Sequence, residues 1–223
     1  MQQQVSMTEP KRYIVSLPRN QRGLLVGQTG SGKSTLAKVI IEDKQPLLII
    51  DPKREFEPFQ GFDVIAEKPR DLSGVKFTTL VYRPTPEYSE PDDYEDVFKW
   101  VYYTGDMFVY IDELTAVTGG PLSYPKWLRA LYVQGRSLNI GTLAATQRPS
   151  MIPTFTLSES RKFWKFFLLM RKDNERMAEF MGEEVLEPHR GAHSFYYKDI
   201  MSSGRAKEYE LQIDVHAEVG GVR

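Results

Sequence analysis

Residues 27–34 read Gly-Gln-Thr-Gly-Ser-Gly-Lys-Ser, which matches the pattern G-x-x-x-x-G-K-[ST] in full. The short apolar segment 23–26 precedes this motif, and residues 35–41 follow it with the composition of a helix. A strand, a glycine-rich loop and a helix in this order form the setting in which the motif binds phosphate groups. The chain is therefore expected to fold around a phosphate-binding loop at the end of a buried strand.

The residue types of this motif have separate physical roles. Glycines allow backbone N–H groups to close around the phosphates of a nucleotide, and the N-terminus of the following helix adds positive potential. Lys33 is predicted to reach the terminal phosphates, and the hydroxyl of Ser34 is predicted to bind Mg²⁺. The predicted nucleotide-binding residues are Gly27, Gln28, Thr29, Gly30, Ser31, Gly32, Lys33, Ser34 and Thr35.

Composition excludes several other classes of protein. Among 223 residues, 41% are apolar and 26% are charged, so the chain can bury a core. The net charge of −1 argues against a uniformly positive surface for nucleic acid but leaves a local basic patch open. Without cysteine there is no disulfide and no Cys-ligated metal. The polar first residues and the short apolar runs predict a soluble, cytoplasmic protein that does not span a membrane.

Apolar strands that alternate with helices predict an α/β fold with a mostly parallel sheet covered on both faces. The predicted strands are 13–17, 23–26, 46–50, 62–66, 79–82, 107–111, 140–145 and 165–170. The predicted helices are 35–41, 92–103, 123–134 with Ser123 as its N-cap, and 174–181. Residues 195–197 and 209–213 predict a C-terminal β-hairpin. We expect a single domain over residues 13–216, between flexible tails at 1–12 and 217–223.

A second motif points to hydrolysis. The predicted strand 107–111 is followed directly by Asp112 and Glu113. Asp112 is expected to hold Mg²⁺ through water together with Ser34, and Glu113 to orient and polarise the attacking water as a general base. Small-molecule kinases exclude water from the phosphate, so the glutamate favours hydrolysis over phosphoryl transfer. The guanine-specifying sequence Asn-Lys-x-Asp is absent, which favours ATP over GTP.

Three further side chains are candidates for the same reaction. Gln147 ends the strand that is expected to lie between the two motif strands, where its amide can contact the γ-phosphate or the attacking water. Arg136 and Arg148 are both candidates for an arginine that reaches the γ-phosphate in a neighbouring subunit. Such a guanidinium stabilises the charge of the transition state. The sequence leaves the choice between the two arginines open.

The phosphate loop, Phe-Val-Tyr-Ile-Asp-Glu at 108–113 and Ala-Ala-Thr-Gln-Arg-Pro-Ser at 144–150 occur in this order. With these elements the chain resembles the FtsK/HerA superfamily of DNA-pumping ATPases. Ile-Ile-Asp-Pro-Lys at 49–53 and Gly-Arg at 135–136 are also similar to the pattern of that group. The resemblance covers about residues 20–200. The nearest likeness is to the small genome-packaging ATPases of tailless, membrane-containing icosahedral viruses.

This resemblance implies a P-loop NTPase fold of the additional-strand, RecA/FtsK-like type and a homo-oligomeric, hexameric ring. Such a ring would use ATP and Mg²⁺ to drive double-stranded DNA into a preformed capsid, in the host cytoplasm or at the packaging vertex of the virion. Capsid or capsid-membrane proteins are then expected partners. Two alternatives remain open from the sequence: a cellular or plasmid-borne DNA translocase or helicase subunit, and a nucleotide-switched assembly protein.

DNA contact is predicted from two regions of the sequence. One is the loop 118–126, which follows the acid pair and contains two adjacent glycines. The other is a set of basic residues, namely Arg161, Lys162, Lys165, Arg171 and Lys172. A motor that grips phosphates without reading bases is expected to bind DNA in a salt-sensitive, sequence-independent way.

Overall fold

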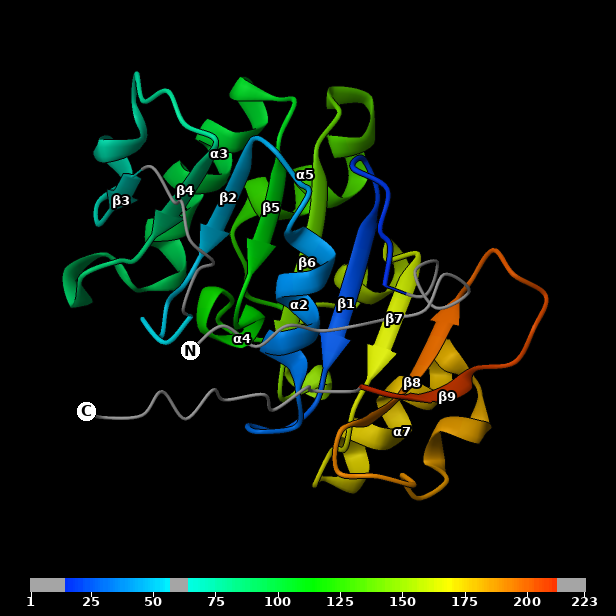
Figure 1. Cartoon of the computed structure of the whole chain (residues 1–223). Coiled ribbons are helices and arrows are strands. Elements are labelled where there is room, and N and C mark those ends of the chain that lie inside the picture. Colours follow the sequence, from blue (N-terminus) through cyan, green and yellow to red (C-terminus); the bar gives the residue numbers. More distant parts are fainter. Residues whose placement is uncertain (1–14, 57–63, 212–223) are drawn as a thin grey trace, which may run out of the picture.

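The strands of the computed structural model, which describes residues 15–56 and 64–211, form a nine-stranded sheet in the order β3-β4-β2-β5-β6-β1-β7-β8-β9 (Figure 1). The strands are β1 (Arg22–Val26), β2 (Leu47–Ile50), β3 (Val64–Ala66), β4 (Thr79–Tyr82), β5 (Phe108–Ile111), β6 (Gly141–Thr146), β7 (Lys162–Lys165), β8 (Ser194–Asp199) and β9 (Lys207–Glu210). Strands β1 to β7 are parallel, whereas β8 and β9 are antiparallel to their neighbours. The expected mostly parallel sheet is confirmed.

Helices cover both faces of the sheet. They are α2 (Lys33–Ile41), α3 (Tyr94–Thr104), α4 (Leu114–Val117), α5 (Lys126–Gln134), α6 (Thr154–Ser158) and α7 (Arg171–Met181). Short 3₁₀ turns are η1 (Pro69–Leu72), η2 (Pro86–Tyr88), η3 (Pro91–Asp93), η4 (Gly135–Leu138), η5 (Pro149–Met151) and η6 (Glu183–Leu186). In Figure 1, α2 lies in front of the sheet, and α3 and α5 lie behind it.

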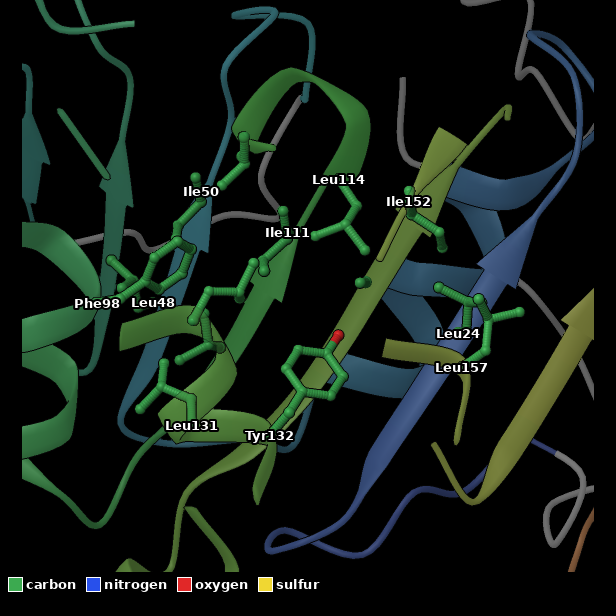
Figure 2. Close-up of a cluster of buried hydrophobic side chains, with 14 of the residues drawn as sticks. Leu24, Leu48, Ile50, Phe98, Ile111, Leu114, Leu131, Tyr132, Ile152 and Leu157 are labelled. Carbon is green, nitrogen blue, oxygen red and sulfur yellow. The ribbon is translucent and has the colours of Figure 1, made fainter. Parts of the chain in front are cut away.

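The alternation of side chains along β2 shows how the two faces are filled. Leu48 and Ile50 pack into a cluster that also contains side chains of α3, α5 and α7, whereas Leu47 and Ile49 pack on the opposite face with α2. Figure 2 shows Tyr132 of α5 on the first of these faces. Each fully buried leucine or isoleucine contributes about 1.5–3 kcal/mol. A strand buried on both faces must be apolar at every position, which is why this segment reads as a continuous apolar run.

Strand β6 lies between β5 and β1, as expected for the additional-strand type. It pairs with β1 through Leu24↔Ala144 and with β5 through Tyr110↔Leu143. Because these strands are parallel, the segments that follow each of them meet at one edge of the sheet. This edge receives the phosphate loop after β1, the acid pair after β5 and Gln147 after β6.

The predicted C-terminal hairpin is confirmed for the described residues. Strands β8 and β9 pair antiparallel, with Ser194 opposite Glu210 and Tyr197 opposite Lys207. The predicted tails lie outside the described residues, as do residues 13 and 14 of the first predicted strand. Residues 15–17 form no strand, so the expectation of a strand there is wrong for the part that is described.

The seventh strand lies earlier in the chain than predicted. Strand β7 covers Lys162–Lys165, and the apolar run 166–170 leaves the sheet after it. The carbonyl of Phe167 instead accepts a hydrogen bond from the amide of Gln28 in the phosphate loop, at 2.9 Å. The prediction followed hydropathy and therefore placed the strand on the apolar run. The observed strand begins and ends with lysine, and both lysines are buried.

The start of α5 also differs from the prediction. The helix begins at Lys126, and Ser123 does not cap it. The carboxylate of Glu95, on α3, instead accepts hydrogen bonds from the amides of Lys126 at 2.7 Å and Trp127 at 2.9 Å. A side chain distant in sequence therefore satisfies the free amides of this helix end. In the described part of the chain, no helix is long and apolar enough to cross a membrane.

Candidate active site

The phosphate loop is fastened to the strands on both sides of β1. The amide of Gly27 donates to the carbonyl of Thr146, at the end of β6, at 3.1 Å. On the other side, Gln28 bonds the segment after β7 as described above. Gly30 and Gly32 have φ values of 78° and 106°, a region that glycine enters without steric cost. The loop is thus held in shape before any ligand binds.

Helix α2 begins directly after this loop, at Lys33. Its N-cap is Gly32, and within the described residues no side chain accepts a hydrogen bond at this cap. The free N–H groups of the first turn, together with the helix dipole, favour a bound anion. Ser34 is exposed in this turn and Thr35 is half-buried. The predicted phosphate ligands therefore surround one uncapped helix end.

The ammonium group of Lys33 is buried beside the acid pair. Its Nζ donates to the carbonyl of Gln28 at 2.9 Å. Burial lowers the pKa of Lys33 to about 8, although the carboxylates of Glu113 and Asp112 act to raise it. The positive charge is therefore poorly compensated by the protein, and the phosphates of a nucleotide would supply the missing negative charge.

Asp112 directly follows β5 and is held by the strand. The hydroxyl of Tyr110 donates to its Oδ1 at 2.7 Å. Burial raises the pKa of Asp112, and the hydrogen bond from Tyr110 opposes this shift. A partly buried carboxylate of this kind is stabilised by a nearby cation.

Magnesium fits the donor set at this place. Within the described residues no cluster of three or more His, Asp or Glu side chains forms a metal cage. Ser34 and Asp112 would contribute one hydroxyl and one carboxylate, which are oxygen donors. Mg²⁺ is typically bound by one or two such groups, with water and phosphate oxygens completing the shell.

The carboxylate of Glu113 has hydrogen-bond partners at both oxygens. Its side chain is only 5% exposed, and Lys53 Nζ lies 3.0 Å from Oε2. The hydroxyl of Thr115 donates to Oε1 at 2.6 Å, and the amide of Thr115 lies 3.4 Å from the same oxygen. Lys53 was not among the predicted site residues. Two signals could have found it: its place in the Ile-Ile-Asp-Pro-Lys segment at 49–53, and its position just after β2, the strand that pairs with β5.

Gln147 and Arg148 follow β6 at the same edge of the sheet. Gln147 is half-buried, between the phosphate loop and the acid pair in the order of the strands. Arg148 donates from Nε to Oδ2 of Asp173, a fully buried residue of α7, at 2.9 Å. Of the two candidate arginines, Arg148 is thus held in an ion pair within its own chain.

Arg136 lies at the opposite edge of the sheet. It is exposed in η4, the turn that precedes β6, whereas the phosphate loop follows the parallel strand β1. The structure therefore does not bring Arg136 to the phosphate loop of its own chain. A role at a γ-phosphate would require the phosphate loop of a second subunit.

The basic residues near β7 do not form one open patch. Lys162 is buried and donates to the carbonyl of Ser16 at 2.6 Å, and Arg161 pairs with Asp199 at 3.2 Å. Lys165 is buried as well. The expectation of a DNA contact is wrong for Lys162 and Lys165, because both side chains are buried. It stays a prediction for Arg161, whose side chain is 36% exposed, and for the exposed Arg171 and Lys172. The loop 118–126 has exposed residues at its centre and remains a candidate.

A cavity of about 750 Å³ lies beside the phosphate loop. Its walls include Gln28–Ser31 on one side and Lys165, Phe167 and His189 on the other. Lys165 Nζ lies 3.4 Å from His189 Nε2, and burial lowers the pKa of Lys165 to about 8. Burial and the nearby ammonium of Lys165 also lower the pKa of His189. An anionic or hydrogen-bond-accepting group bound at this wall of the cavity would stabilise the ammonium of Lys165.

The geometry of this edge agrees with comparisons to known proteins. The family model described as "Helicase HerA, central domain" matches residues 20–106. The chain is 29% identical over 174 residues to the DNA packaging ATPase P9 of Enterobacteria phage PRD1, an alignment that covers 72% of this chain and 70% of that protein.

Solved structures show the same fold. The genome packaging NTPase B204 from Sulfolobus turreted icosahedral virus 2, determined in complex with AMPPCP, superposes with a TM-score of 0.69 at 17% sequence identity. The match covers 87% of this chain and all of that one. At this identity the similarity establishes the fold, a mostly parallel sheet with helices on both faces.

Proposed function

Because this chain is an ATPase of the FtsK/HerA type, we propose that it is a motor that moves double-stranded DNA into a viral capsid. One observation carries the proposal: β1, β5 and β6 end at a single edge of the sheet and bring Lys33, Glu113 and Gln147 to it. The packaging role is supported by the relatives, which are a DNA packaging ATPase and a genome packaging NTPase. The continuous sheet supports the single domain expected for residues 13–216.

Nucleotide binding is the first step of the proposed cycle. The amides of residues 27–35 and the ammonium of Lys33 would bind the phosphates of ATP, and the pKa of Lys33 would rise again as the anion compensates its charge. Ser34 and Asp112 would hold Mg²⁺, which supplies positive charge to the β- and γ-phosphate oxygens when it is bound.

Hydrolysis is assigned to the acid pair and its neighbours. Glu113 would accept a proton from the attacking water, for which one of its oxygens must face that water. The amide of Gln147 would orient the water or contact the γ-phosphate. Positioning and electrostatic stabilisation account for most of the catalysis of phosphoryl transfer, so displacements of these groups would change turnover strongly.

The position of Arg136 supports the proposal of a ring. This residue is exposed and lies at the edge of the sheet opposite its own phosphate loop, so it would act on the γ-phosphate of a neighbouring subunit. We therefore propose a homo-oligomeric ring, hexameric by resemblance, with the loop 118–126 as the DNA contact. Such a ring would work in the host cytoplasm and at the packaging vertex, against capsid or capsid-membrane proteins.

Displacement of a third strand from duplex DNA tests the motor function directly. The protein is expected to remove a triplex-forming oligonucleotide from duplex DNA in the presence of ATP and Mg²⁺, while Glu113→Gln removes none. Hydrolysis without displacement would favour a nucleotide-switched assembly protein. Strand separation on forked DNA would favour a helicase subunit of the same superfamily.

A further inference from the structure

Both carboxylate oxygens of Glu113 are held by hydrogen bonds in the arrangement that the structure shows. A general base needs an oxygen lone pair directed at the proton it takes. Here Oε1 accepts hydrogen bonds from Thr115, and Oε2 accepts one from Lys53 at 3.0 Å. With the side chain of Glu113 only 5% exposed, water has little access to the carboxylate.

We propose that Lys53 is a positioning residue that restrains Glu113, and that hydrolysis requires the contact between Lys53 and Glu113 to open. The inference rests on the proposed function, because it takes Glu113 as the general base. It adds a restraint on that base, located outside the phosphate loop and outside the acid pair.

Lys53 is suited to this task in a way that Thr115 is not. Thr115 belongs to α4, which Glu113 itself caps, so the two residues move together. Lys53 follows β2, a different element, and its ammonium provides a contact between Glu113 and that strand. The side chain of Lys53 is 33% exposed, so its ammonium can return to water when the contact opens.

The turn that carries Lys53 is connected to the edge of the sheet. The buried carboxylate of Asp51 accepts hydrogen bonds from Arg83 Nε at 2.8 Å and from the amides of Glu55 and Phe56. Arg83 directly follows β4. A shift of β4 would therefore be transmitted through Asp51 to the turn.

The next residue of the turn adds a second connection. Arg54, which has a φ of 59°, pairs with Glu67 at 2.9 Å, and Glu67 follows β3. Strands β3 and β4 form one margin of the sheet, at the left of Figure 1. A displacement of this margin when the motor engages DNA would therefore move the turn that carries Lys53 and release Glu113.

Turnover of Lys53→Gln tests the restraint. In the absence of DNA, kcat is expected to rise about two- to fivefold, the change that follows when a partly exposed ion pair no longer has to be broken. The KM for ATP should stay the same, and stimulation by DNA should shrink. Lys53→Arg, which keeps the charge, is expected to change kcat less than Lys53→Gln does.

Lys76→Gln provides a matched control, since Lys76 is exposed and the same charge is removed away from the acid pair. This variant is expected to leave kcat and DNA stimulation unchanged. A kcat for Lys53→Gln equal to that of the wild type would overturn the inference. A lower kcat with and without DNA would overturn it as well, because Lys53 would then support catalysis rather than restrain it.

A measurement without hydrolysis separates the restraint from the proposed function. Absence of any turnover above Glu113→Gln would count against the ATPase role. The interaction between Lys53 and Glu113 would then be measured as a coupling free energy, from urea unfolding of Lys53→Gln, Glu113→Gln and the double variant. The effects of the two substitutions are expected to be non-additive with Mg²⁺ and a non-hydrolysable ATP analogue alone, and additive when double-stranded DNA is also present. Additivity under both conditions would overturn the inference.

Discussion

Arg148 and Asp173 join the end of β6 to α7. Arg148 Nε lies 2.9 Å from Asp173 Oδ2, and the amide of Ser150 donates to Oδ1 at 3.0 Å. Asp173 is fully buried, whereas the side chain of Arg148 is 46% exposed. The ion pair thus holds the segment that follows Gln147 in place and engages Arg148 within its own subunit.

Replacement of Asp173 by alanine is expected to destabilise the fold. The substitution leaves a backbone N–H without its acceptor and breaks a partly exposed ion pair, at a cost of about 1–3 kcal/mol in the free energy of unfolding. Asp173→Asn keeps an acceptor oxygen, so its free energy of unfolding should fall by less than that of Asp173→Ala. Urea denaturation of the three proteins measures both effects. Equal stability of Asp173→Ala and the wild type would show that the pair contributes nothing.

Arg136→Ala is expected to retain ATP binding and to lose turnover, because the guanidinium acts on the site of a neighbour. Mixed with Lys33→Ala subunits, it should regain part of the activity, since some sites then combine an intact phosphate loop with an intact Arg136. Steady-state hydrolysis over a series of mixing ratios measures this rescue. Absence of rescue at every ratio would argue against a shared site.

Lys33→Ala and Glu113→Gln should separate binding from chemistry. Lys33→Ala removes the charge that faces the phosphates and is expected to weaken ATP binding about tenfold or more. Glu113→Gln keeps the phosphate loop and should bind ATP like the wild type while hydrolysing it at least about a hundredfold more slowly. Titration with a fluorescent ATP analogue and single-turnover hydrolysis measure the two properties. Wild-type turnover in Glu113→Gln would contradict the role of the base.

Lys165→Met should change stability in a pH-dependent way. Burial lowers the pKa of Lys165 to about 8 from its ordinary value of 10.5. Below pH 8 both folded and unfolded chains hold the proton, so the cost of burying the ammonium is present in full. As the pH rises from 8 to 10.5, the unfolded chain binds more protons and the wild type gains stability.

The free energy of unfolding of Lys165→Met is therefore expected to exceed that of the wild type by up to about 3 kcal/mol near neutral pH. This difference should shrink toward pH 10. Urea unfolding at several pH values measures the difference. The variant could instead be less stable than the wild type at pH 7, by an amount that does not change as the pH rises. That result would show that the contact with His189 and the packing of the lysine stem outweigh the cost of burying the charge.

Much of this fold was predictable because its strands are buried on both faces. The run Leu47–Ile50 is wholly apolar, and the phosphate-loop motif places a strand before it and a helix after it without ambiguity. These features depend on local sequence, which hydropathy and glycine spacing describe well. The place of β6 between β5 and β1 was instead implied by the additional-strand type of ATPase.

Contacts between distant segments were not predictable in the same way. Strand β7 contains two buried lysines whose partners come from elsewhere in the fold, so hydropathy placed the strand too late. The cap of α5 comes from Glu95, about thirty residues earlier in the chain, and Lys53 reaches Glu113 from sixty residues away. Such pairs depend on the order of the strands, which single residues do not encode.

The measurement that tests the central claim most directly is steady-state ATP hydrolysis with and without double-stranded DNA, at two salt concentrations. Glu113→Gln serves as the blank. We predict hydrolysis above this blank that DNA stimulates, and a stimulation that weakens at the higher salt concentration because the contacts are made to phosphates. Hydrolysis that is equal with and without DNA at both salt concentrations would contradict the assignment of this protein as a DNA motor.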